Sequence, residues 1–141
     1  MGAGAKAVMN EKVLQDQVGK IGQHLGLKVA YNSRAGKTIW GTLRKIDVLL
    51  TLTDRNDMPL KRLGIECISQ EGGGTAKYKV VAKHEDMKHW PVDNVLVYGG
   101  DGFGDKVEAV MDYMGSVPVE DLEQHLRYYF GLKGVGGNPE P

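Results

Sequence analysis

The order of hydrophobic and polar residues along the chain predicts alternating helices and strands. Hydrophobic residues recur at helical spacing from Asn10, a good N-cap, to about residue 26, and predict the first helix. A strand is expected to start over Lys28–Tyr31, with a turn at Ser33–Lys37 that leads into Thr38–Leu43. The N-terminal third therefore reads as a helix followed by extended chain.

Two apolar runs in the middle of the chain predict neighbouring strands. They cover Ile46–Leu52 and Arg62–Ser69, and the polar segment Asp54–Pro59 connects them. After the glycines at 72–74, Thr75 can cap a basic helix that runs to about Lys88. The pattern thus predicts a hairpin or meander and then a helix.

The C-terminal part predicts one more strand and two helices. The strand covers Asn94–Tyr98, and the helices lie near Asp105–Met114 and over Val119–Phe130. The resulting order α-β-β-β-α-β-α-α indicates an α/β fold in which a mixed central sheet of about four strands is flanked by helices. The helix between Arg62–Ser69 and Asn94–Tyr98 is a crossover, so these two strands are expected to be parallel.

Composition narrows the class of protein. A length of 141 residues is typical of one domain, expected over residues 1–131, with a flexible tail rich in Gly and Pro over 132–141. No apolar run approaches the ~20 residues of a membrane span. With Cys67 as the single cysteine and no apolar core of a secretory signal near the N-terminus, we expect a cytoplasmic protein.

The formal net charge of zero hides a separation of charge. Residues 1–88 carry 15 basic and 9 acidic side chains, whereas residues 89–141 carry 3 basic and 9 acidic ones. Such a separation suggests a surface that binds nucleic acid or a membrane. The alternative is that these charges are scattered over a solvated surface.

Two acidic residues interrupt apolar strands. Asp47 lies within Ile46–Leu52 and Glu66 within Arg62–Ser69, where an ionised carboxylate is costly unless it is paired or binds a metal. On adjacent antiparallel strands the two carboxylates would be suitable ligands for Mg²⁺. Alternatively, each faces solvent at an edge or pairs with a nearby arginine or lysine.

Alternation along the second of these strands places Glu66, Ile68 and Gln70 on one face. With Asp47 on the preceding strand, the pattern resembles the PD-(D/E)XK nuclease superfamily, including the Holliday-junction-resolvase-like group. Its signature is an Asp on the second strand and Glu-x-Lys on the third. The resemblance implies a restriction-endonuclease-like α-β-β-β-α-β core, and Glu11 on the first helix would correspond to an additional acid near the metal.

One position departs from the signature. Ile68 stands where the superfamily has its lysine, and it can neither donate a proton nor stabilise charge. In some members the lysine has moved to another element, and the basic helix offers Lys77 and Lys79. Alternatively, the chain is inactive, either as a natural binding protein or through substitution at Ile68.

The resemblance further implies an endonuclease that hydrolyses DNA with Mg²⁺, or Mn²⁺ as a substitute, held by Asp47 and Glu66. Gln70 would hold a water or a phosphate oxygen, and a lysine would stabilise charge. We expect a duplex or branched DNA partner, a homodimer or higher oligomer, and a prokaryotic, phage or mobile-element host. The expected contacts to DNA phosphates are Arg34, Lys37, Arg44, Lys45 and Lys83, although Lys83 also fits a solvated helix face.

Overall fold

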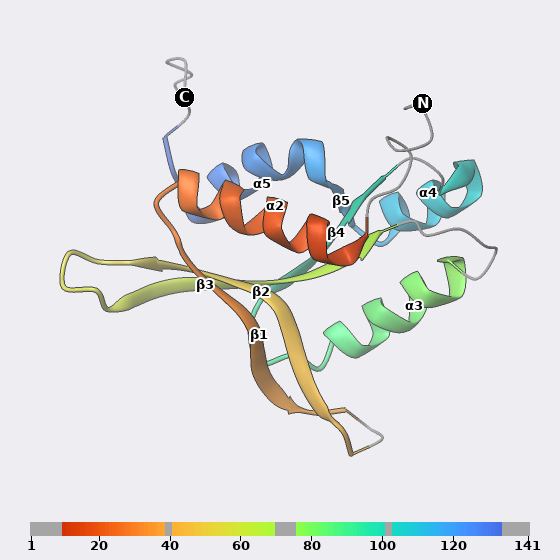
Figure 1. Ribbon diagram of the computed structural model, residues 1–141, viewed down its shortest axis with the longest axis horizontal. Coiled ribbons are helices and arrows are strands. Elements are labelled where there is room, and N and C mark those ends of the chain that lie inside the picture. Colours follow the sequence, from red (N-terminus) through yellow and green to blue (C-terminus); the bar gives the residue numbers. More distant parts are fainter. Residues whose placement is uncertain (1–9, 39–40, 70–75, 101–102, 134–141) are drawn as a thin grey trace.

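The computed structural model describes residues 10–38, 41–69, 76–100 and 103–133. A five-stranded sheet in the order β1-β2-β3-β4-β5 forms its centre. Helices α2 and α5 cover one face of the sheet, and α3 and α4 lie on the other (Figure 1). The predicted α/β fold with a mixed sheet between helices is confirmed. The bounds are α2 Glu11–His24, β1 Lys28–Lys37, β2 Leu43–Thr53, β3 Pro59–Ser69, α3 Ala76–Met87, β4 Asn94–Gly99, α4 Gly104–Tyr113, β5 Val117–Pro118, the 3₁₀ turn η1 Val119–Asp121 and α5 Leu122–Phe130.

The directions of the strands follow from the connections. Strands β1, β2 and β3 pair antiparallel, whereas β3 and β4 pair in parallel from Gly64↔Asn94 to Ser69↔Gly99. The predicted parallel crossover through α3 is therefore confirmed. Strand β5, parallel to β4, was not predicted, because two residues are too short to show a periodic pattern.

The first helix forms where its pattern predicts it. The side chain of Asn10 accepts a hydrogen bond from the Val13 N–H at 2.9 Å, and Leu14 and Val18 are fully buried against the sheet. Gly22 allows the helix to approach β2 closely, because a Cβ at this position would lie 2.7 Å from Leu50. Packing of α2 on the sheet thus creates one of the two cores.

The predicted turn at Ser33–Lys37 is wrong. These residues continue β1, with Ser33 opposite Ile46 and Arg34 opposite Lys45. The register shifts between Arg34 and Lys37, where Gly36 has a φ of +81°. The polar, glycine-containing segment is a bulge inside a long hairpin. It does not form a turn, because pairing with β2 satisfies its backbone groups.

The β1–β2 hairpin projects from the body of the molecule, and the β2–β3 hairpin extends at another end (Figure 1). The predicted polar loop at the second tip is present, and the Asp54 carboxylate accepts the backbone N–H groups of Asn56 and Met58. Across the described ranges, no helix combines the length and the apolar character needed to cross a membrane. Leu132 packs against the α2-side core, and the rest of the expected tail, beyond Lys133, lies outside the described residues.

Candidate active site

Asp47 lies where β2 separates from β3. The ladder between these strands ends at Val48↔Ile65, whereas pairing of β2 with β1 continues through Ile46. Just beyond the end of the ladder, Asp47 Oδ2 accepts the backbone N–H of Cys67 at 2.9 Å. The Asp47 side chain thus accepts the hydrogen bond that a backbone carbonyl of a paired strand would otherwise accept from Cys67. This bond fixes the carboxylate between the two strands.

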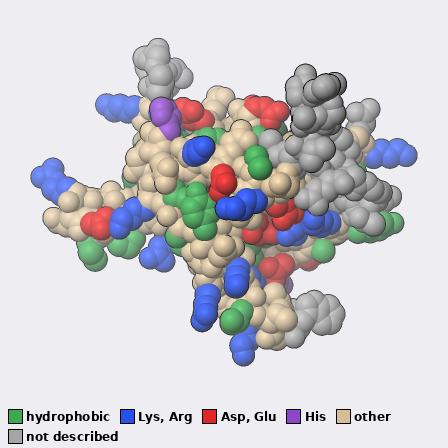
Figure 2. Space-filling view, viewed as in Figure 1, with side chains coloured by type: hydrophobic (Ala, Val, Ile, Leu, Met, Phe, Trp, Pro, Cys, Tyr) green, Lys and Arg blue, Asp and Glu red, His purple; other side chains and the backbone are tan. Residues whose placement is uncertain are grey.

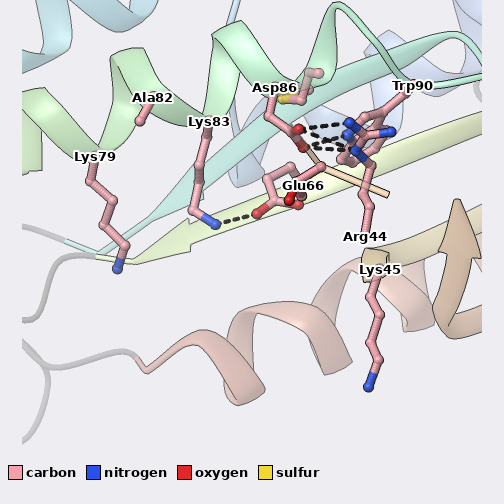
Figure 3. Close-up of a pocket in the computed structure, with 10 residues that line it drawn as sticks. Arg44, Lys45, Glu66, Lys79, Ala82, Lys83, Asp86 and Trp90 are labelled. Atoms are coloured by element: carbon pink, nitrogen blue, oxygen red, sulfur yellow. Dashed lines mark hydrogen bonds and ion pairs between the residues drawn. The ribbon is translucent and has the colours of Figure 1, made fainter. Parts of the chain in front are cut away.

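Glu66 occupies the α3-facing side of β3 and is 7% exposed. The next residue, Cys67, packs in the α2-side core on the opposite face of the sheet. The Lys83 ammonium reaches across from α3 and donates to Glu66 Oε2, as the dashed line in Figure 3 shows. A carboxylate in the sheet and an ammonium on the crossover helix therefore form a charged pair beneath the surface.

Burial perturbs this group of charges. It raises the pKa of Glu66 to about 7, an effect that Lys83 opposes and the charge of Asp47 reinforces. Burial also raises the pKa of Asp47, although the Cys67 N–H and Lys83 counteract it. Burial alone would lower the pKa of Lys83, but the carboxylates of Glu66, Asp47 and Glu11 outweigh it and raise that pKa. The carboxylates thus interact electrostatically and compete for positive charge.

A second ion pair lies at the edge of this group. Lys79 Nζ is 3.2 Å from Glu11 Oε2, so that α3 is linked to the first turn of α2. The charge of Glu11 also raises the pKa values of Asp47 and Glu66. Its side chain is 32% exposed, compared with 10% for Glu66, so Glu11 lies on the outer side of this group.

Arg44 lies inside the molecule. Its guanidinium is 7% exposed, pairs with the Asp86 carboxylate at 2.9 Å through Nη2, and donates to the Ala35 carbonyl. The Trp90 indole N–H donates to the same carboxylate at 3.1 Å. These contacts connect the β1–β2 hairpin to α3. The guanidinium donors are therefore occupied within the fold, and Arg44 is not exposed as the phosphate contact that the sequence suggested.

A pocket of about 300 Å³ opens between α3 and the β1–β2 hairpin. Glu66 and Lys83 lie in it, and Lys45 and Lys79 lie at its border (Figure 3). Asp47 is not part of its lining. The lining consists of Thr38, Arg44, Lys45, Glu66, Lys79, Ala82, Lys83, Asp86, Met87 and Trp90.

Exposed cations lie beside this pocket. Arg34, Lys37 and Lys45 are exposed on the β1–β2 hairpin, and Figure 2 shows Lys and Arg side chains along this projection. Gln70 and the side chain of Lys77 lie outside the described residues. The structure thus brings together five charged side chains near the pocket, Glu11, Asp47, Glu66, Lys79 and Lys83, with the hairpin cations next to them.

Asp47 and Glu66 are candidate ligands of a divalent cation. Within the described ranges, no three His, Cys, Asp or Glu side chains converge as a metal site. Mg²⁺, however, typically takes one or two carboxylates and keeps several waters. Asp47 and Glu66 meet that requirement, and the ammonium on Glu66 shows that this carboxylate already accepts a cation. The residues present therefore fit one hydrated divalent ion.

Ile68, at the position of the motif lysine, belongs to the apolar core on the α3 side. It is 1% exposed and packs in the same cluster as Val80 of α3 and Leu96 of β4. Among the described side chains, the ammonium that contacts Glu66 comes instead from Lys83, which the sequence suggested as a DNA contact or as part of a solvated helix face. A helical spacing of four places Lys83 on the same side of α3 as Lys79, and this signal could have grouped them.

Comparison with protein-family models matches residues 3–125 to the PD-(D/E)XK nuclease superfamily domain. The match spans well over half of the chain and includes α2, the first four strands, α3 and the site described above. A search of curated proteins finds no match.

Proposed function

Because the chain belongs to the PD-(D/E)XK nuclease superfamily, we propose that it is a metal-dependent endonuclease that hydrolyses phosphodiester bonds in DNA. The observation that carries the proposal is that two carboxylates on neighbouring strands, the partly buried Asp47 and the buried Glu66, interact electrostatically beside a pocket lined by basic residues. Buried acids of this kind are costly unless a cation balances them.

Asp47 and Glu66 would hold Mg²⁺, for which Mn²⁺ would substitute, with Glu11 in the outer part of the site. When bound, the ion supplies a water of lowered pKa and polarises the scissile phosphate. The chain itself fixes the two carboxylates: the Cys67 N–H holds Asp47, and burial on β3 holds Glu66. Lys79, and with it Lys77 and Gln70 by resemblance, would orient the water and the phosphate.

Exposed cations on the β1–β2 hairpin would contact the DNA backbone. Arg34, Lys37 and Lys45 stand beside the pocket without burial. Contacts of this kind supply affinity but little sequence preference. The proposed substrate is therefore duplex or branched DNA held along the hairpin, with the scissile phosphate at the pocket.

We further propose that the protein acts as a homodimer or a higher homo-oligomer. One chain offers one such site, whereas cutting both strands of a duplex needs two. The last helix offers only its outer side to such an interface, because α5 buries Leu122, Leu126 and Phe130 in the core of its own chain. Tyr128, which is 89% exposed, remains available on its outer side.

Ile68 favours a second candidate function, a DNA-binding protein without catalysis. A fully buried isoleucine at the motif-lysine position removes the group that the superfamily signature places there. Tight, salt-dependent binding without cutting is the expected behaviour of such a protein.

A nicking assay separates the two candidates. The purified chain is incubated with single-stranded, duplex and branched DNA in Mg²⁺ or in EDTA, beside Asp47→Ala. The nuclease proposal expects Mg²⁺-dependent nicks that Asp47→Ala abolishes. Binding without cutting in the parent, with cutting gained by Ile68→Lys, would indicate an inactivated nuclease. Neither binding nor cutting would overturn both candidates.

A further inference from the structure

The pocket holds an arrangement of charge that the sequence did not predict. Lys83 projects from the middle of α3 and places its ammonium on Glu66, with only 26% of the lysine side chain and 10% of the glutamate side chain exposed. A lysine at this depth loses water on most sides and needs a fixed partner. In the structure, Glu66 is that partner.

The charge count shows what the site lacks. The carboxylates of Glu11, Asp47 and Glu66 face the ammonium groups of Lys79 and Lys83, which leaves one negative charge when all are ionised. One divalent cation would change the net charge of the site to one positive charge, which is opposite and equal to the charge of a phosphodiester group. The two lysines therefore nearly balance the carboxylates in the metal-free chain, and a metal would compete with them.

The two lysines differ in what a metal would displace. Lys79 pairs with Glu11 at the outer edge, where the two side chains are 49% and 32% exposed. Lys83 occupies an oxygen of Glu66, one of the two carboxylates that fit the metal. A cation that binds Glu66 through this oxygen must move the Lys83 ammonium, whereas the Lys79 pair can remain.

We propose that Lys83 is a displaceable counter-ion that holds Glu66 in the metal-free protein and, once a divalent cation takes its place, turns its ammonium toward the scissile phosphate. This inference rests on the proposed function. Lys83 would then stabilise the negative charge at the phosphate, which Ile68 cannot do. The lysine would come from α3, whereas the motif position lies on β3. The flexible four-carbon stem of lysine allows the ammonium to move while its backbone stays in the helix.

Metal affinity tests the exchange independently of cleavage. Isothermal titration with Mn²⁺ compares the parent with Lys83→Met, which keeps an unbranched side chain one atom shorter and removes the charge. We expect the variant to bind Mn²⁺ about tenfold more tightly, because no ammonium competes for Glu66. The matched control is Lys88→Met, which removes the same charge from an exposed pair at the end of α3 and should leave the affinity unchanged. Equal or weaker binding by Lys83→Met overturns the inference.

A second measurement does not depend on the folding of a variant. In parent protein with ¹³C-labelled lysine, the ε-CH₂ signal of Lys83 should move as Mg²⁺ saturates the site. The signal of Lys61, whose ammonium contacts the Tyr129 carbonyl, should stay in place. A stationary Lys83 signal at saturation overturns the exchange.

Cleavage at saturating Mn²⁺ tests the second half of the inference. Lys83→Met should cut at least about a hundredfold more slowly than the parent despite its tighter metal binding, and Lys83→Arg should restore part of the rate. Full activity of Lys83→Met overturns the role at the phosphate. If the parent binds no metal, the proposed function fails together with this inference; if it binds metal and Lys83→Met binds no better, only this inference fails.

Discussion

At the scale of single residues, the site consists of buried acids, and contacts within the fold must offset the energetic cost of burying their charge. Asp47 is held by a backbone N–H, and Glu66 by a lysine from another element. Both carboxylates have raised pKa values, first because burial disfavours their charge. We therefore expect a divalent cation to displace a proton or the lysine ammonium from these carboxylates.

Glu66 should make the metal-free protein less stable as the pH rises. Its pKa goes from 4.5 to about 7 on folding, so between these values the folded chain keeps a proton that the unfolded chain has lost. The free energy of unfolding then falls with increasing pH, by at most about 1.4 kcal/mol per pH unit from this group. Glu66→Gln should remove that contribution.

Urea unfolding in EDTA at several pH values between 4.5 and 8 measures the effect. The stability of the parent relative to Glu66→Gln should decline up to about pH 7 and then level off. A difference that stays constant over this range would show that Glu66 titrates normally in the folded chain.

The sequence predicted that Asp47 and Glu66 lie on neighbouring strands, but it did not predict the contact between Lys83 and Glu66. Asp47 and Glu66 stand out because they interrupt apolar strands, and the antiparallel pairing of β2 and β3 was predicted. The contact between Lys83 and Glu66 depends on how α3 crosses the sheet, which no local pattern specifies. The pairing of Arg44 with Asp86, 42 positions away, is likewise not specified by a local pattern. It buries Arg44, which the sequence suggests as a surface cation.

At the scale of elements, polar contacts contribute much of the positioning of α3. Within its described part, Val80 and Met87 are its buried hydrophobic residues. Polar links to other elements accompany them, among them Lys79 to Glu11, Lys83 to Glu66, His84 to Ser116, and Asp86 to Arg44. The helix that carries the candidate lysines is thus held against β3, the α4–β5 connection and the hairpin.

Asp86→Ala should destabilise the protein and release the hairpin from α3. It leaves the Arg44 guanidinium buried without its carboxylate, which costs about 3 kcal/mol in pairs of this kind. Thermal unfolding followed by circular dichroism measures the loss as a lower midpoint. Glu85→Ala, at the adjacent position and in an exposed pair with Lys88, is the control and should leave the midpoint unchanged. Equal midpoints for the two variants would contradict a structural role of the Arg44–Asp86 pair.

The elements themselves were largely predictable, and the exceptions have physical causes. The first helix and the middle strands follow from periodicity and an N-cap at Asn10. The segment Ser33–Lys37 reads as a turn because glycine and polar residues usually mark one, but long-range pairing makes it a bulged strand. The last helix begins at Leu122 after a 3₁₀ turn, one turn later than its pattern indicates.

At the scale of the whole molecule, the separation of charge along the sequence becomes a separation in space. The basic hairpin belongs to the β1 edge of the sheet, whereas the exposed acids Glu108, Asp112, Glu120 and Asp121 lie on α4 and η1, the elements on either side of β5 in the sequence. The zero net charge therefore conceals a molecule with a basic edge and an acidic edge. A polyanion would be drawn to the hairpin and repelled by the opposite edge.

Neutralising the hairpin should weaken DNA binding in a salt-dependent way. For the double variant Lys37→Ala and Lys45→Ala, we expect the slope of log affinity against log salt to fall by about 0.9 for each lost phosphate contact on duplex DNA. Fluorescence anisotropy over a salt series measures this slope. Lys106→Ala, an exposed lysine on α4, is the control and should leave the slope unchanged. An unchanged slope in the double variant would place DNA elsewhere on the surface.

We propose that Asp47 and Glu66 together hold one divalent cation for DNA hydrolysis. An anomalous difference map from crystals of the chain grown with Mn²⁺, beside crystals of Asp47→Asn, locates the ion. We expect a single strong peak between the two carboxylates, with the Lys83 ammonium moved away from Glu66, and no such peak in the variant. A parent map without a peak at this place, or with the ion bound elsewhere, would show that the two carboxylates do not form the metal site.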